Sequence, residues 1–142
     1  MPVSEGYREF VLDQLGRIAP VTWRPMFGGV GIYQQGVFFA LLDDDTLFFT
    51  VDDTTRARYH AAGVGPFTYG SPPQVSTGYY QVPGELLEDT ENLKSWMYEA
   101  VEVARRRRAA RADASRKWRK GARKPKAKAR PSRKRPTRRR KT

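Results

Sequence analysis

The pattern of apolar and polar residues divides the first 51 residues into one helical and one strand-forming stretch. After Ser4, a favourable helix N-cap, apolar residues recur at three- and four-residue spacing as far as Ile18. This spacing predicts an amphipathic helix of about four turns that Pro20 ends. From Val21 to Val51 the sequence is instead rich in β-branched and aromatic residues, which predicts strands. The expected strands are residues 23–27, 29–33, 37–42 and 46–51.

Short polar turns separate the central strands. Gln34–Gly36 and Asp43–Asp45 each leave room only for a tight connection. A parallel return would need a crossover of about a dozen residues, so both connections must be antiparallel hairpins. The first strand contains Pro25, which cannot donate a ladder hydrogen bond and therefore favours a sheet edge.

The second half of the chain predicts two more helices and two short strands. Asp52 or Asp53 caps a helix over 54–62, which Gly63 ends. Strands are expected over 67–69 and 79–82, with a loop of undefined shape over 70–74 and a short turn from Pro83 to Leu87. Asp89 or Thr90 caps a last helix with one apolar face. That face comprises Leu93, Trp96, Met97, Ala100, Val101 and Ala104, and we expect it to pack on the sheet.

These elements together predict an α+β fold, an antiparallel β-meander with helices packed on one face, followed by a disordered basic tail. Charge supports the division. Residues 1–104 hold six basic and 14 acidic residues, a formal charge of −8, whereas residues 105–142 hold 21 basic residues and one acid, a charge of +20. We therefore expect an acidic domain over 1–108 and a basic, largely disordered tail over 109–142.

The tail changes character along its length. Four arginines extend the last helix, and alanines after them permit helix as far as Trp118, before Gly121 ends it. From Gly121 onward the chain has no large apolar residue, so nothing offsets the entropy of ordering and disorder is expected. Its Lys/Arg/Ala/Pro composition resembles the tails of linker histones and of basic-tailed bacterial nucleoid proteins.

Such a polycation is typical of nucleic-acid binding, because displacing condensed counterions from phosphates gives affinity without sequence readout. We expect DNA rather than RNA as the ligand. A solubility tail and attachment to an anionic membrane are the alternatives, although a membrane anchor would need a second apolar signal. The expected nucleic-acid-binding residues are Arg105, Arg106, Arg107, Arg108, Arg111, Arg116, Lys117, Arg119, Lys120, Arg123, Lys124, Lys126, Lys128, Arg130, Arg133, Lys134, Arg135, Arg138, Arg139, Arg140 and Lys141.

Other chemistry finds little support in the sequence. The chain has no cysteine and one histidine, His60, so thiolate and multi-histidine metal sites are excluded. The glycines at 28, 29, 31 and 36 lack the Lys-Ser/Thr of a phosphate loop and lie between strands, which favours tight turns. No apolar stretch approaches the length of about 20 residues that spans a membrane. We therefore expect no catalytic residue, metal or cofactor. We expect a cytoplasmic location.

The chain resembles the TfoX/Sxy N-terminal domain family over about residues 5–108. The resemblance runs through Arg24-Pro-Met-Phe-Gly-Gly-Val-Gly-Ile-Tyr, Phe49-Thr-Val-Asp-Asp-Thr-Thr-Arg, Pro66-Phe-Thr-Tyr and Tyr80-Gln-Val-Pro. It implies a small α+β domain of bacterial competence regulators that assist a cyclic-AMP receptor protein at promoters, with no enzymatic activity or cofactor. The family motif includes Arg24, Met26, Phe27, Gly28 and Gly29, as structural or partner-binding residues. A basic tail stands where regulators of this family carry a second domain.

Two hypotheses follow for the function. In the first, the protein is a nucleoid-associated, non-enzymatic accessory factor: the tail holds DNA or RNA and the acidic domain engages a transcription regulator. In the second, the domain is a protein-interaction or chaperone-like adaptor, dimeric through a sheet edge, and the tail is incidental.

Overall fold

Tight hairpins join the first four strands wherever the sequence places a short polar turn. The computed structural model, which describes residues 3–26 and 28–122, pairs these strands consecutively and antiparallel. They are β1 (Thr22–Met26), β2 (Gly29–Gln34), β3 (Val37–Asp43) and β4 (Thr46–Thr50). Gln35 and Gly36 in one turn, and Asp44 and Asp45 in the next, have positive φ angles. Two such residues in succession give a turn the twist of the flanking strands. The predicted hairpins are confirmed.

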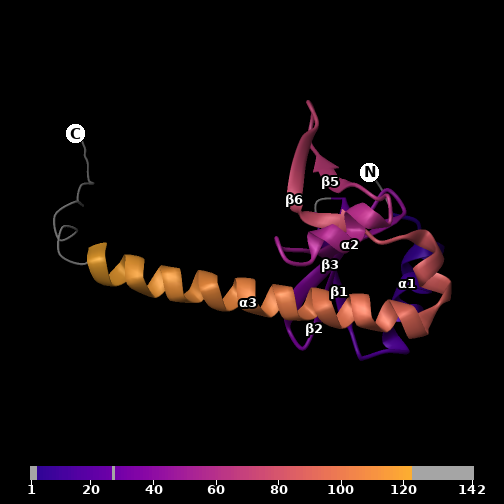
Figure 1. The fold of residues 1–142 in the computed structure, drawn as a ribbon, viewed down its shortest axis with the longest axis horizontal. Coiled ribbons are helices and arrows are strands. Elements are labelled where there is room, and N and C mark those ends of the chain that lie inside the picture. The colour runs from indigo at the N-terminus through magenta and orange to yellow at the C-terminus, as the bar shows by residue number, and fades with distance from the viewer. Residues whose placement is uncertain (1–2, 27, 123–142) are drawn as a thin grey trace, which may run out of the picture. The chain divides into compact units, whose positions relative to one another are not determined.

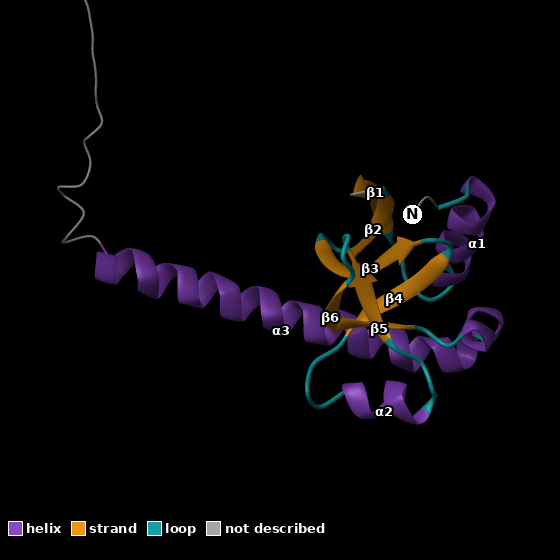
Figure 2. Ribbon diagram, turned by 90° about the horizontal axis from the view of Figure 1, so that it is seen from above, coloured by secondary structure: helices purple, strands orange, loops and turns teal. Residues whose placement is uncertain are grey.

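The last two strands do not follow the sequential order of a simple meander. β5 (Pro66–Tyr69) and β6 (Gln74–Gln81) form a hairpin, and β6 also pairs with β4. The strand order is therefore β1-β2-β3-β4-β6-β5 (Figure 2). The sequence predicted a loop over 70–74 and a strand only over 79–82. The side chains after Gln74 show no clear alternation of apolar and polar residues, so the sequence gives no strand signal there. Strand β6 begins at Gln74 because pairing with β5 satisfies the backbone hydrogen bonds of this stretch.

Local capping sets the first two helices. The Ser4 hydroxyl accepts the N–H of Tyr7 at 3.2 Å and caps α1 (Glu5–Gly16), which ends before the predicted Pro20. Helix α2 (Arg56–Ala61) begins two residues later than predicted. The Asp52 carboxylate accepts the N–H groups of Thr54 and Thr55, so it caps the turn that leads into α2 rather than the helix itself.

A short 3₁₀ helix, η1 (Gly84–Glu88), forms the turn expected after Pro83 and leads to α3 (Thr90–Ala122). Asp89 caps α3 by accepting the N–H of Asn92 at 3.3 Å. Helix α3 continues through Gly121, where the sequence predicted its end. A single glycine costs a helix only about 1 kcal/mol, and no proline follows before Pro125. The prediction of disorder for residues 123–142 lies outside the described residues.

The chain divides into two units, Met1–Arg107 and Arg108–Thr142, which we call the module and the basic segment. Helices α1, α2 and α3 all contribute to one hydrophobic core on one face of the sheet, which confirms the α+β prediction (Figure 1). Met97 and Val101 of α3 are buried in it, as predicted. Trp96 is only partly buried; it packs against this core and lies edge-on to Tyr59 of α2, at a centroid distance of 4.7 Å. The core also includes Val11, Leu15, Ile32, Phe39, Leu42, Leu47, Phe49, Tyr80 and Leu93.

The opposite face of the sheet carries half-buried aromatic side chains. Phe38 lies 5.4 Å from Tyr33 and 5.9 Å from Tyr79, measured between ring centroids, and Phe48 lies 5.0 Å from Phe67. These contacts join neighbouring and next-neighbouring strands. The sheet therefore has an aliphatic and aromatic core on its helix side and an aromatic surface on its other side.

Candidate nucleic-acid interface

The expected interface starts where α3 leaves the core, and its first three arginines contact the module. Arg105 donates to the side-chain oxygens of Gln34 and Gln35, at 3.3 and 2.9 Å. Arg106 pairs with Asp52 at 2.9 Å. The Arg107 guanidinium donates to the carbonyl oxygen of Val51 at 2.6 Å. Among the expected phosphate-binding residues, these three therefore also fasten α3 to the sheet.

The Arg107 guanidinium lies close to the backbone of Gly78, where a side chain would be tightly packed. A Cβ added at Gly78 of β6 would lie 3.3 Å from the Arg107 guanidinium. The N–H of Val51 also donates to the carbonyl oxygen of Gly78, at 2.9 Å. Arg107 thus lies over the junction of β4 and β6, where its charge is partly withdrawn from solvent.

Arg106 has two acidic partners, Asp52 and, at 3.7 Å, Glu102, and Asp52 is the nearer. Burial by itself would raise the pKa of Asp52, but hydrogen bonds from the Thr54 hydroxyl, Arg106 and two backbone N–H groups hold the pKa well below its ordinary value. Asp52 therefore stays ionised over the whole physiological range and pairs with Arg106 throughout.

The described part of the basic segment, 108–122, is helical, and its residues from Arg108 to Arg119 are exposed. It contains six basic residues and one acid, a formal charge of +5. The acid, Asp113, pairs with Arg116 at 3.1 Å and Lys117 at 3.5 Å, and Arg119 donates to Ser115 at 2.9 Å. These ion pairs at i,i+3 and i,i+4 support the helix without removing its net positive charge.

An exposed aromatic ring interrupts the charges of this helix. Trp118 is 71% exposed and lies next in sequence to Lys117 and Arg119. The sequence predicted Trp118 as the limit of the helix and as too little, by itself, to anchor a membrane. The other expected binding groups lie outside the described side chains: Lys120, Arg123, Lys124, Lys126, Lys128, Arg130, Arg133, Lys134, Arg135, Arg138, Arg139, Arg140 and Lys141.

The family motif lies in the β1–β2 hairpin, where several of its residues have close neighbours. The Arg24 guanidinium lies over the Tyr33 ring, 5.4 Å from its centroid. A Cβ at Gly29 would overlap the carbonyl oxygen of Leu42, and Gly28 has a positive φ of 83°. Met26 fills the space above Gly31, within 2.7 Å of where a Cβ would stand. Phe27 lies outside the described residues.

His60 and Asp45 have partners within the module. His60 Nε2 lies 3.0 Å from the Tyr80 hydroxyl, a contact that the sequence did not predict. Asp45 accepts the N–H of Ser4 at 2.7 Å. Within 3–26 and 28–122, no three His, Cys, Asp or Glu side chains gather in a way that could hold a metal ion. None of the helices described is long and apolar enough to cross a membrane.

The arrangement defines a small α+β module, a six-stranded antiparallel sheet with helices on one face, whose last helix continues into a basic segment. A family model for the TfoX N-terminal domain matches residues 13–104, and the chain belongs to this family. No curated protein matches the chain. Family membership indicates a regulatory, competence-related role.

Proposed function

We propose that the protein is a non-enzymatic, nucleic-acid-associated regulator of the TfoX/Sxy type. Its basic segment binds DNA, in preference to RNA, without reading sequence. Its module engages a transcription regulator, such as the cyclic-AMP receptor protein that the family resemblance suggests. The protein acts at the nucleoid.

The observation that carries this proposal is the cationic helix of residues 108–122, which is exposed from Arg108 to Arg119. Its formal charge of +5 continues into a further 12 basic residues without an acid, which brings the basic segment to +17. A segment of this charge density neutralises DNA phosphates and releases their counterions, which is favourable at any sequence. Arginine adds bidentate contacts to phosphate oxygens.

The salt dependence of binding tests the proposal. If the segment neutralises about 8 phosphates, log affinity should fall against log salt with a slope near −7. Fluorescence anisotropy on the full chain with labelled duplexes measures it. A shallow slope, or a tenfold preference for one duplex over a scrambled duplex at equal salt, would contradict the proposal.

A pair of matched variants locates the contact. Arg111→Gln with Arg119→Gln removes two charges from the exposed helix, and the slope should become shallower by about 2. Arg17→Gln with Lys94→Gln removes two exposed charges from the module and should leave the slope unchanged. If the two double variants behave alike, the contact lies elsewhere than in the helical part of the basic segment.

A further inference from the structure

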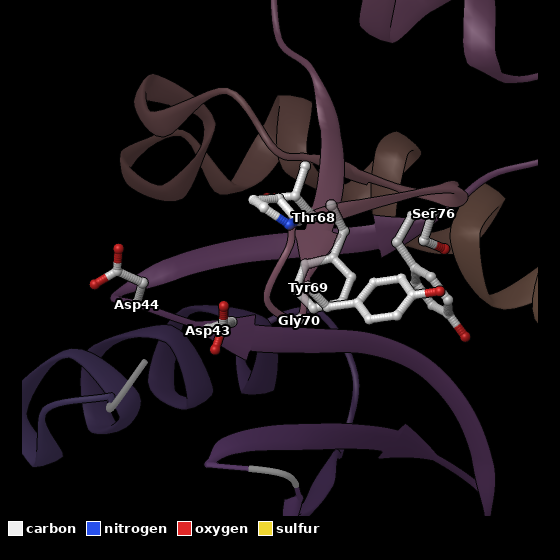
Figure 3. A pocket seen from close by; sticks show the side chains of 9 residues that line it. Asp43, Asp44, Thr68, Tyr69, Gly70 and Ser76 are labelled. Carbon is white, nitrogen blue, oxygen red and sulfur yellow. The ribbon is translucent and has the colours of Figure 1, made fainter.

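An open cleft lies on the aromatic side of the module. It has a volume of about 930 Å³, and strands β3, β5 and β6 contribute its walls. Figure 3 shows the carboxylates of Asp43 and Asp44 on one side and Thr68, Tyr69 and Ser76 farther along it. Neither the family motif nor the proposed nucleic-acid interface uses these residues.

Aromatic rings make the cleft apolar over much of its length. Phe67 and Tyr69 stack with a centroid distance of 6.0 Å and an interplanar angle of 21°. Tyr69 is 50% exposed although it is large and apolar, and Tyr79 adds a third ring to the lining. Such rings present flat faces that attract cations and pack against proline.

The acidic residues at one end of the cleft determine the sign of the charge that its ligand should carry. Asp44 is exposed in the β3–β4 turn and Asp43 is half-buried beside it. Among the described residues, none of those that line the cleft is basic. The exposed carboxylate of Asp44 disfavours phosphate groups and favours arginine or lysine, so the ligand is expected to be a cation rather than a nucleic acid.

The chain itself contains a segment with this chemistry. Residues 123–137 hold eight basic residues, no acid, and three dipeptides in which a basic residue precedes proline: Lys124-Pro125, Arg130-Pro131 and Arg135-Pro136. The residue before a proline favours an extended backbone, and extended basic-proline peptides dock in aromatic-lined grooves. The module, at −5, complements the charge of this segment.

We propose that the cleft is a peptide-binding site, and that its occupant is the basic-proline segment, residues 123–137, of a second copy of this chain. Proline packs on the Tyr69 and Phe67 rings, while arginine or lysine pairs with the Asp44 carboxylate at the rim. The cleft itself shares no residue with the proposed DNA interface, whereas its occupant, residues 123–137, is part of the basic segment. Peptide binding to the cleft and DNA binding are therefore measured separately, so that one can fail without the other.

A labelled synthetic peptide with the sequence of residues 123–137 tests the site. Titrated with the full chain at 150 mM salt, it should bind, and Tyr69→Ala or Asp44→Asn should each weaken binding at least fivefold. Asparagine tolerates the positive φ of Asp44, so this substitution removes charge without strain. Tyr69→Phe keeps the ring and should bind nearly as the unmodified chain does.

Two controls separate the cleft from general attraction. Glu88→Gln removes one exposed charge outside the cleft, and Val75→Ala trims an exposed apolar residue of β6 outside it. Both should stay within twofold of the unmodified chain. A peptide with its three prolines replaced by alanine has the same charge and should bind at least fivefold more weakly. Equal losses in the controls, or equal binding of the alanine peptide, would overturn the site.

The occupant is tested by sedimentation of the full chain over a range of concentrations. Reversible association that Tyr69→Ala weakens and Val75→Ala does not would support docking of a second copy. A chain that stays monomeric at concentrations where the free peptide binds would overturn that occupant. DNA binding measured on Tyr69→Ala shows separately whether the basic segment still functions.

Discussion

Gly29 shows how strongly the fold depends on one backbone position. A Cβ there would overlap the Leu42 carbonyl oxygen in the neighbouring strand, and backbone cannot move aside as a flexible side chain can. We expect Gly29→Ala to lower the free energy of unfolding by about 1–3 kcal/mol, as overpacking does. Urea denaturation followed by circular dichroism measures the change.

Gly6 gives the matched control. It lies in α1, and a Cβ there would meet nothing within 4 Å. Gly6→Ala should therefore raise the free energy of unfolding by up to about 1 kcal/mol, because alanine is the better helix former. If Gly29→Ala and Gly6→Ala were equally stable, β2 and β3 could move apart to accept the Cβ at Gly29 without lowering the free energy of unfolding.

Asp52 makes stability depend on pH. Because its pKa is lowered in the folded state, its contribution is present above the ordinary carboxyl pKa of about 3.9 and is lost as pH falls below it. Asp52→Asn keeps an oxygen acceptor for the backbone of Thr54 but removes the charge paired with Arg106. At pH 7 it should destabilise the protein by about 1–2 kcal/mol.

Urea denaturation at several pH values checks this prediction. The difference between the variant and the unmodified protein should stay constant from pH 7 to about pH 5 and shrink steadily below pH 4. A difference that stays the same down to pH 3 would show that the charge of Asp52 is not what stabilises the turn.

At the scale of elements, Trp96 connects α3 to α2. Its ring lies edge-on to Tyr59, and the Arg58 guanidinium lies over it at 4.3 Å while also pairing with Glu99 at 3.1 Å. Since the ring is only partly buried, Trp96→Ala should cost about 2–3 kcal/mol, at or below the lower end for aromatic truncation in a core.

Thermal unfolding measures this loss against two other variants. Trp96→Phe keeps a ring against Tyr59 and should lose less than half as much. Tyr98→Ala removes a neighbouring ring on α3 that is 46% exposed, and it should cost about 1 kcal/mol or less. If Trp96→Ala were no worse than Tyr98→Ala, the contact between α2 and α3 would contribute nothing to stability.

The helices and hairpins were predictable from the sequence where a single local feature, a cap or a short turn, determines them. Ser4 caps α1 as its side chain suggests, and short polar turns produce the first two hairpins. The start of α2 was missed because Asp52 caps a preceding turn, a choice between two local structures of similar energy. The start of β6 was missed because its partner strand determines it.

At the scale of the whole molecule, charge is divided between the two units. The module has a formal charge of −5 and the basic segment +17, and both follow from composition alone. In our proposals the basic segment binds phosphate, and the cleft of the module binds the basic-proline part of that segment from a second copy. Salt should weaken both interactions, but only the peptide should depend on Tyr69.

The sequence by itself determined the α+β class, the antiparallel hairpins, the buried face of α3 and the separation of charge. Periodicity and composition are properties of neighbouring residues, so short-range physics is enough to predict them. Only the tertiary structure decided that β6 inserts beside β4, that Arg105, Arg106 and Arg107 contact the module, and that Asp43, Asp44 and Tyr69 line one cleft. Such contacts join residues far apart in the chain, and whether they form depends on packing that no local pattern records.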